Sequence, residues 1–289
     1  MQMYLLCFKV ISVIVNDSIV QAYLKGNSIE DFHDEWYFTH STVAGQIGKN
    51  IFTVPDDSIK QKAKVHVVYA SLYQAAGNFE PINMPIWDAL FANWRETLET
   101  VQVDLILGFP EPFDATVERD DGGVQRIIFD MSCWTKYLGR CDIAEVARNL
   151  LTHELCHVLI GKQIPQIDED MKNTDYHIAL DALTFHEAFA HLVSYDAKEI
   201  GDVDWDTPKL AEVRKTSNET MRNALRELDK KEQERYLYTA QCGDYYEKYA
   251  CMSGMLYLAA LWQRGGVSAL KACFDEGYIG FAEKCSEEV

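Results

Sequence analysis

The five residues His153-Glu154-Leu155-Cys156-His157 constrain this chain most, because they follow the pattern H-E-x-x-H within a stretch of helical periodicity. Residues four apart share one face of an α-helix, so the two imidazoles can reach one metal ion from the same side. Glu154 would then lie beside the ion, where its carboxylate can take a proton from water. The pattern therefore predicts a helix that presents a metal site.

The residues around this motif predict a well-buried helix over 143–160. Asp142 and Glu145 form a start that resembles a capping box, and Gly161 is the candidate for the C-terminal cap. Apolar side chains recur at helical spacing between these ends. Two histidines and a glutamate in such a helix need partners, since unpaired polar groups are costly to bury. The alternative to a metal site is a pair of structural histidines that are hydrogen-bonded within the core.

A catalytic zinc ion commonly takes three protein ligands and keeps its fourth position for water. The extended pattern H-E-x-x-H-x-x-G-x-x-H needs Gly and His where this chain has Ile160 and Gln163, so it does not read as a metzincin. A downstream carboxylate is the other common solution. A second helix is predicted over 176–200, with Thr174-Asp175 at its start and Gly201 at its end, and it contains Glu187. Glu187 is the natural third ligand.

On this second helix, Glu187 shares one face with Ala190, His191 and Ser194. The small side chains of Ala190 and Ser194 would let the first helix approach closely. His191, one turn beyond Glu187, could orient a ligand through a hydrogen bond. His186 points about 100 degrees away from the Glu187 face and is a weaker candidate. A solvated Glu and His pair on a polar face is the alternative reading of Glu187 and His191.

An H-E-x-x-H helix followed by a glutamate on a later helix resembles the gluzincin, or thermolysin-like, branch of zinc metallopeptidases. The resemblance covers about residues 100–200, and the whole chain looks most like uncharacterised bacterial zinc-dependent peptidases. The resemblance implies that His153, His157 and Glu187 bind Zn²⁺ and that Glu154 is the general base.

Two positions depart from the pattern of that family. His191 stands where thermolysin-like enzymes have Asp, and no later His is present to stabilise a transition state. The group that stabilises the oxyanion must then be Tyr, Arg or an earlier His. Tyr245 and Tyr246, which precede an apolar helix, are candidates because a tyrosine hydroxyl can donate to a developing oxyanion. The alternative for both is packing with a satisfied hydroxyl.

We expect a mainly helical α+β fold with a single domain over 1–289. Residues 1–135 form the strand and helix part that carries the sheet, and residues 136–289 form the helical part that carries the metal site. Strand signals occur at 4–15, 101–108 and 124–130, with a hairpin turn at Asp120-Asp121-Gly122-Gly123. By the resemblance, the fold is zincin-like, with a small mixed sheet ahead of the motif helix. Residues 124–130 would then be an edge strand that binds an extended peptide, and an ordinary inner strand is the alternative.

Composition excludes several classes of function. The chain has 289 residues of which 48% are hydrophobic, so it can bury a sizeable core. Its formal net charge of -18 argues against binding nucleic acid or an anionic membrane surface. The acidity would attract a basic peptide, although solubility alone also explains it. Eight cysteines without a C-x-x-C pair indicate reduced thiols. Because residues 4–15 are too short to span a membrane and lack a basic start, we expect a cytoplasmic protein.

These observations predict a zinc metallopeptidase, more specifically a metalloendopeptidase that hydrolyses peptide or protein substrates. Glu154 favours this reading, because a purely structural metal site needs no base. The alternative is a non-catalytic zincin-like module that binds metal or another protein. A metal-free helical scaffold is a third possibility. Substrate specificity and oligomeric state are left open by the sequence.

Overall fold

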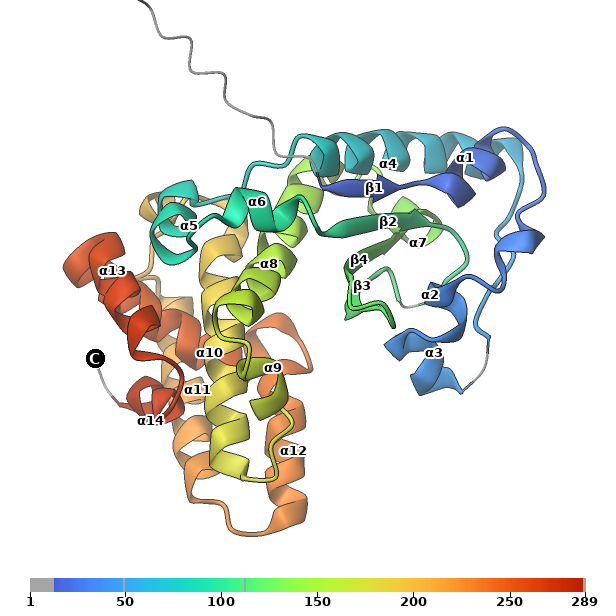
Figure 1. The fold of residues 1–289 in the computed structure, drawn as a ribbon. Coiled ribbons are helices and arrows are strands. Elements are labelled where there is room, and N and C mark those ends of the chain that lie inside the picture. Colours follow the sequence, from blue (N-terminus) through green and yellow to red (C-terminus); the bar gives the residue numbers. More distant parts are fainter. Residues whose placement is uncertain (1–12, 49, 112, 288–289) are drawn as a thin grey trace, which may run out of the picture. The chain divides into compact units, whose positions relative to one another are not determined.

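The computed structural model describes residues 13–48, 50–111 and 113–287 of the chain (Figure 1). Helices predominate, and the described strands form one small mixed sheet, which confirms the predicted mainly helical α+β class. The chain divides into two compact units. Unit 1 contains the described residues up to Glu80 and Arg95–Leu151, and unit 2 contains Pro81–Trp94 and the described residues from Thr152 onward. Over the described ranges, no helix is long and apolar enough to cross a membrane.

The elements follow the chain through both units. Unit 1 contains β1 (Ile14–Asn16), α1 (Ser18–Leu24), α2 (Trp36–Thr39), α3 (Thr42–Ile47), α4 (Ile59–Gly77), β2 (Gln102–Ile106), β3 (Ala115–Arg119), β4 (Gln125–Asp130) and α7 (Met131–Trp134). Unit 2 contains α5 (Met84–Leu90), α9 (Ile167–Asp170), α10 (Tyr176–Ser194), α11 (Pro208–Arg226), α12 (Lys230–Gln241), α13 (Tyr249–Glu276) and α14 (Phe281–Ser286). The unit boundary falls within α6 (Trp94–Leu98) and α8 (Ile143–Gln163). Short 3-10 turns are η1 (Glu30–Phe32), η2 (Thr135–Tyr137), η3 (Tyr195–Ala197), η4 (Ile200–Asp202) and η5 (Tyr245–Glu247).

The sheet of unit 1 has the order β1-β2-β4-β3, with β3 antiparallel to β4 and the other pairs parallel. Gly123 donates its N–H to the Asp120 carbonyl at the predicted hairpin turn. β4 pairs with β2 on one side and β3 on the other, so the prediction that 124–130 is a substrate-binding edge strand is wrong. A strand pattern reports which side chains are buried, but not which strands become neighbours. The strand predicted over 4–15 lies largely outside the described residues and overlaps only the start of β1.

The helix that carries the H-E-x-x-H motif, α8, begins as predicted and ends later than predicted. Asp142 Oδ1 accepts the N–H groups of Ala144 and Glu145 at 2.9 and 3.3 Å. The helix continues through Gly161 to Gln163, so the prediction of a cap at Gly161 is wrong. A Cβ at position 161 would lie 3.1 Å from a carboxylate oxygen of Asp168. Gly161 therefore lies inside the helix and leaves room for the Asp168 side chain of α9.

The second predicted helix, α10, is the central element of unit 2. Asp175 caps its start by accepting the N–H groups of His177 and Ile178. It ends at Ser194, short of the predicted Gly201. Nearly all of its side chains are buried, because α9, α12, α13 and α14 all pack against it (Figure 1). A helix that is buried on nearly every side belongs in the middle of a bundle.

Helices α10 and α13 approach each other most closely at Gly254. A Cβ built at this position would lie only 2.6 Å from the Ala188 Cβ, a separation that real side chains do not reach. Glycine is therefore required for the observed packing. Because Glu187 precedes Ala188 and Cys251 lies one turn before Gly254, this contact also fixes the first turns of α13 beside Glu187.

Candidate metal centre

The three predicted ligands converge within unit 2. The Nε2 atoms of His153 and His157 on α8 are 3.0 Å apart. The Glu187 carboxylate on α10 lies 3.9 Å from His153 Nε2 through Oε2 and 3.7 Å from His157 Nε2 through Oε1. Donor atoms about 2.0–2.1 Å from a tetrahedral zinc ion are about 3.3 Å from one another. These spacings therefore fit one shared ion.

A serine fixes the tautomer of the first histidine. The Ser194 hydroxyl donates to the Ala190 carbonyl at 2.8 Å, so its oxygen accepts from His153 Nδ1 at 3.2 Å. With the hydrogen on Nδ1, Nε2 carries a lone pair, and it lies 3.0 Å from His157 Nε2. Metal-binding histidines are commonly held in this way by a partner on the other ring nitrogen. The expected contact between the two helices at Ser194 is thus present.

The second histidine is supported by an aromatic contact. The His157 ring stacks on His186 with centroids 4.1 Å apart and planes 20° from parallel. His157 Nδ1 and His186 Nε2 are both buried without a hydrogen-bond partner among the described residues. Sequence reasoning ranked His186 as weaker because it turns away from Glu187 on the helical wheel. It nevertheless reaches the centre, because α8 presents His157 to more than one position of α10.

Burial controls the charge of the three ligands. It lowers the pKa of His153 to about 3, reinforced by the neighbouring His191, and lowers the pKa of His157 well below its usual value. Burial raises the pKa of Glu187, but the adjacent His157 and His191 outweigh it and hold that pKa well below its usual range. Neutral imidazoles and an ionised carboxylate are the forms that bind a metal cation.

Glu154, the predicted base, lies next to His153 on α8. Burial, followed by the negative charge of Glu187, raises the pKa of Glu154 to about 8, and the positive charge of Lys248 opposes this rise. Within the described part of the chain, its carboxyl makes neither a hydrogen bond nor an ion pair. A carboxyl with a pKa near neutrality can both accept and return a proton.

His191 lies where it can orient Glu187. Its Nδ1 atom is 3.0 Å from the Glu187 carbonyl oxygen and 3.3 Å from Glu187 Oε2. A carbonyl oxygen only accepts, so Nδ1 carries a hydrogen and donates it. The arrangement fits the predicted role of His191 as a group that positions the ligand.

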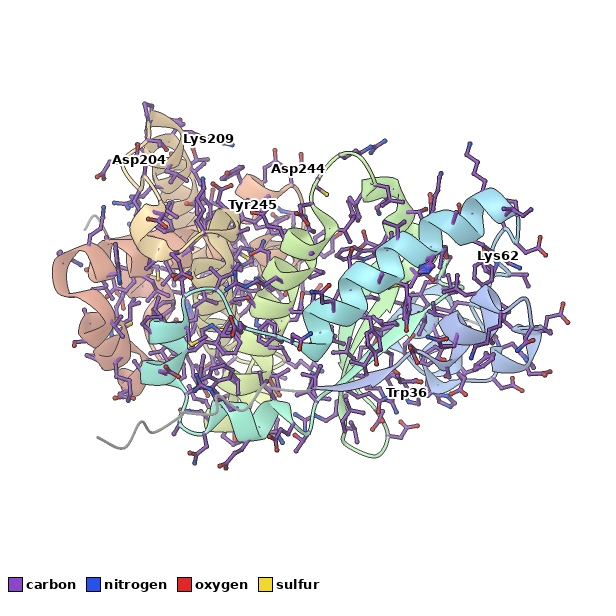
Figure 2. All side chains as sticks on the ribbon, turned by 90° about the horizontal axis from the view of Figure 1, so that it is seen from above. Trp36, Lys62, Asp204, Lys209, Asp244 and Tyr245 are labelled. Atoms are coloured by element: carbon purple, nitrogen blue, oxygen red, sulfur yellow. The ribbon has the colours of Figure 1, made fainter. Side chains whose placement is uncertain are left out.

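The two candidate tyrosines have different surroundings. The Tyr245 ring lies 5.6 Å from the His191 ring, which brings Tyr245 next to the centre (Tyr245 and Lys209 are labelled in Figure 2). Desolvation by the surrounding protein raises the pKa of Tyr245 although this residue is 40% exposed, so its hydroxyl stays protonated and able to donate. The Tyr246 hydroxyl instead lies 3.3 Å from the Tyr195 hydroxyl, and the centre of the Tyr246 ring lies 3.6 Å from the Lys209 ammonium. Tyr245 is therefore the better candidate for a group that contacts a substrate.

Two residues near the centre were not predicted from the sequence. The ammonium of Lys248, at the start of α13, lowers the pKa of both His153 and Glu154. The buried thiol of Cys251 lies 3.6 Å from Glu187 Oε2, across a separation of 64 residues along the chain. No periodic pattern connects these residues to the H-E-x-x-H motif. Only the packing of α13 against α10 brings them there.

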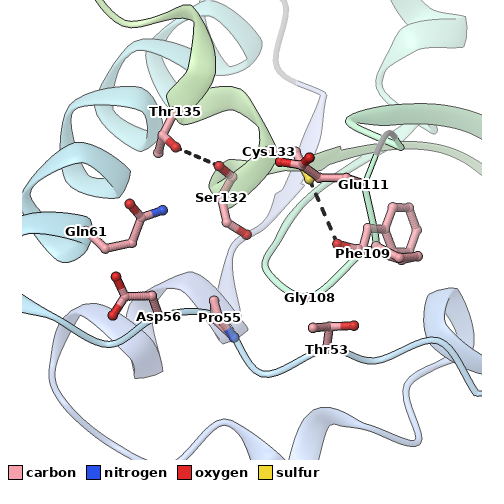
Figure 3. Close-up of a pocket in the computed structure, with 11 residues that line it drawn as sticks. Thr53, Pro55, Asp56, Gln61, Gly108, Phe109, Glu111, Ser132, Cys133 and Thr135 are labelled. Atoms are coloured by element: carbon pink, nitrogen blue, oxygen red, sulfur yellow. Dashed lines mark hydrogen bonds between the residues drawn. The ribbon is translucent and has the colours of Figure 1, made fainter.

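Unit 1 contains a separate pocket of about 290 Å³ (Figure 3). It lies where β2 and β4 end, because parallel strands bring their carboxyl ends to one edge of the sheet. Its lining consists of Thr53, Pro55, Asp56, Gln61, Gly108, Phe109, Pro110, Glu111, Ser132, Cys133 and Thr135. Burial raises the pKa of the Cys133 thiol to about 12, which leaves it a poor nucleophile. The pocket thus offers no activated group comparable to the histidine centre.

Comparisons with protein-family models, with curated proteins and with solved structures found no match. The gluzincin resemblance therefore stays a prediction based on the motif residues. The chemistry of the centre has to be inferred from its own donor atoms and their neighbours.

Proposed function

We propose that unit 2 carries the centre of a zinc-dependent peptidase. One observation carries the proposal: two imidazole nitrogens and one carboxylate converge within 3.0 to 3.9 Å of one another. His153, His157 and Glu187 would hold the ion, and Ser194 and His191 would keep two of these ligands oriented. Zinc, when bound there, would supply a Lewis acid that polarises a peptide carbonyl and makes water more acidic.

In this proposal Glu154 is the general base. Its carboxylate takes a proton from the attacking water as the new C–O bond forms. It then gives that proton to the nitrogen of the leaving amine as the C–N bond breaks. The raised pKa of Glu154 suits both steps, because the group must gain and lose the same proton in one turnover.

The carbonyl oxygen of the substrate gains negative charge during this reaction and needs a donor. Tyr245 and Lys248 are our candidates, since the Tyr245 ring lies 5.6 Å from the His191 ring and the charge of Lys248 acts on His153 and Glu154. Lys248 was not among the groups expected from the sequence. The substrate class we propose is peptide or protein. We also propose a cytoplasmic location, on the sequence grounds given above.

The test is a Glu154→Gln variant of the full chain, with Glu145→Gln on the exposed side of the same helix as its control. Glu154→Gln should retain zinc by elemental analysis and lose hydrolysis of a peptide library by at least about 100-fold, as expected for removal of a general base. Glu145→Gln should retain both zinc and hydrolysis. Full hydrolysis by Glu154→Gln would refute the mechanism. Zinc bound in wild type without any hydrolysis would instead favour the non-catalytic metal-binding module.

A further inference from the structure

The Glu187 carboxylate has two further donor atoms beside Oε2, the oxygen that also lies 3.9 Å from His153 Nε2. Its Oε2 atom lies 3.3 Å from His191 Nδ1 and 3.6 Å from Cys251 Sγ. One ligand atom from each of the three residues lies within 4.8 Å of the other two. His191 and Cys251 are only 3% and 0% exposed, so these donors are held inside the protein. A buried nitrogen, sulfur and carboxylate oxygen thus meet at one point.

In the metal-free chain, hydrogens bridge these contacts. The Cys251 thiol can donate to Glu187 Oε2 and to the Ala240 carbonyl, which is 3.4 Å away. The His191 Nδ1–H donates to the Glu187 carbonyl oxygen at 3.0 Å, and Nδ1 lies 3.3 Å from Oε2 of the carboxylate. On binding of a divalent cation, the Cys251 thiol would release its proton to solvent and the His191 proton would move from Nδ1 to Nε2, which frees a lone pair on each donor atom. Metal binding commonly releases protons from its ligands in this way.

We propose that Glu187, His191 and Cys251 form a second zinc-binding position, which shares the Glu187 carboxylate with the position between His153 and His157. For zinc, a bound nitrogen and oxygen lie about 3.3 Å apart and a bound sulfur and oxygen about 3.5 Å apart. The observed contacts of 3.3 and 3.6 Å match these separations. Thiolate and imidazole donors select zinc and similar borderline ions over magnesium or calcium.

The fold holds these donors in place. His191 lies one turn beyond Glu187 on the buried helix α10. Cys251 lies one turn before Gly254, where α13 meets Ala188 too closely for any larger side chain. Neither helix can shift at this contact without breaking the core. The thiol therefore remains beside Glu187.

Cobalt titration of the full chain tests the second position, because cobalt(II) reports its ligands by absorption. We expect two equivalents of Co²⁺ to bind, accompanied by a near-ultraviolet thiolate-to-cobalt charge-transfer band. Cys251→Ser should bind one equivalent and lose the band. Cys285→Ser, which changes another fully buried cysteine of unit 2, should still bind two equivalents and show the band. His191→Gln provides a second variant that should weaken the band while leaving every thiol in place.

Wild type alone can overturn the proposal, so it does not depend on the folding of a variant. Absence of a thiolate band at saturating cobalt would show that His191 and Cys251 only hydrogen-bond to Glu187. If wild type binds a single equivalent of Co²⁺ and Cys251→Ser binds the same amount, His191 and Cys251 are likewise not metal ligands. His157→Ala should lose one equivalent and retain the band. The second position and the proposed peptidase centre can thus fail independently of each other.

Discussion

The Glu187 carboxylate lies within 4 Å of donor atoms from four side chains, those of His153, His157, His191 and Cys251. It is also the only one of the three proposed ligands outside the H-E-x-x-H motif. Its identity as the third ligand is therefore the interpretation most in need of a direct measurement.

Glu187→Ala should reduce zinc affinity by at least about 100-fold, since loss of a ligand exceeds the 10- to 100-fold cost of losing a group that only orients one. Competition with a chelating dye measures this directly. Glu199→Ala, at an exposed glutamate of unit 2 whose carboxylate accepts the Asn83 N–H, serves as the control for general effects of losing a carboxylate. Unchanged zinc content in Glu187→Ala would transfer the role of third ligand to His191 or His186.

The depressed pKa values of the histidines lead to a prediction about pH. Because burial lowers the pKa of His153 to about 3 and that of His157 well below its usual value, protons should not compete with zinc near pH 5.5. In Cys251→Ser, which removes the thiol of the second position, zinc affinity should then change less than about 3-fold between pH 7.5 and 5.5. Two exposed histidines with an ordinary pKa of about 6.5 would lose about 100-fold over that range. A loss of that size in chelator competition would contradict the buried, neutral state of these ligands.

The sequence identified the residues of the centre that are close together along one helix. His153, Glu154 and His157 are recognisable because metal chemistry needs a fixed helical spacing, and Glu187 because the chain supplies a carboxylate on the next long helix. Lys248 and Cys251 could not be found in the same way. Their position near Glu187 depends on how α13 packs against α10, and no local sequence pattern predicts that packing.

Among the elements, the core helices were predicted better than their ends. Asp142 and Asp175 cap the starts of α8 and α10 as expected, because capping uses side chains that are visible in the sequence. Gly161 was misread as a helix end. Glycine is chosen both for turns and for close contacts, and only the position of Asp168 distinguishes the two cases.

The contact between α10 and α13 gives a prediction about stability. Gly254→Ala would add a Cβ 2.6 Å from the Ala188 Cβ, so we expect the free energy of unfolding to fall by about 1–3 kcal/mol, as for other overpacked cores. Denaturant unfolding measures the change. Gly201→Ala, whose Cβ would make an ordinary 3.7 Å contact with Trp262, should lower the free energy of unfolding by a smaller amount. Adding Ala188→Gly to Gly254→Ala should restore part of the lost free energy of unfolding. If the double variant is as unstable as Gly254→Ala alone, the contact between positions 188 and 254 does not set the distance between the two helices.

At the scale of the whole molecule, the chain builds two units that are not continuous in sequence. Residues 81–94 belong to unit 2 although residues on both sides belong to unit 1. The expectation of a single domain over the whole chain stays a prediction. All of the proposed ligands nevertheless lie in unit 2.

This division predicts where zinc should stabilise the protein. A ligand present at 100 times its dissociation constant stabilises the state that binds it by about 2.7 kcal/mol. Removing zinc with a chelator should therefore speed amide hydrogen exchange in α10 and the first turns of α13, and leave β2 and β4 unchanged. Hydrogen exchange with mass spectrometry would measure both regions in one sample. Equal acceleration in the sheet of unit 1 would show that zinc acts elsewhere.

The burial of α10 on nearly every side also limits how this centre could be altered. Substitutions on α10 that change the chemistry would also disturb the packing, since His186, Glu187, His191 and Ser194 all project from a helix embedded in the core. The segment from Tyr245 to Lys248 is different, because its side chains are exposed or partly exposed. A library that seeks new substrate preferences should therefore vary Tyr246 and Glu247 of that segment, and leave α10 and the proposed oxyanion donors Tyr245 and Lys248 unchanged.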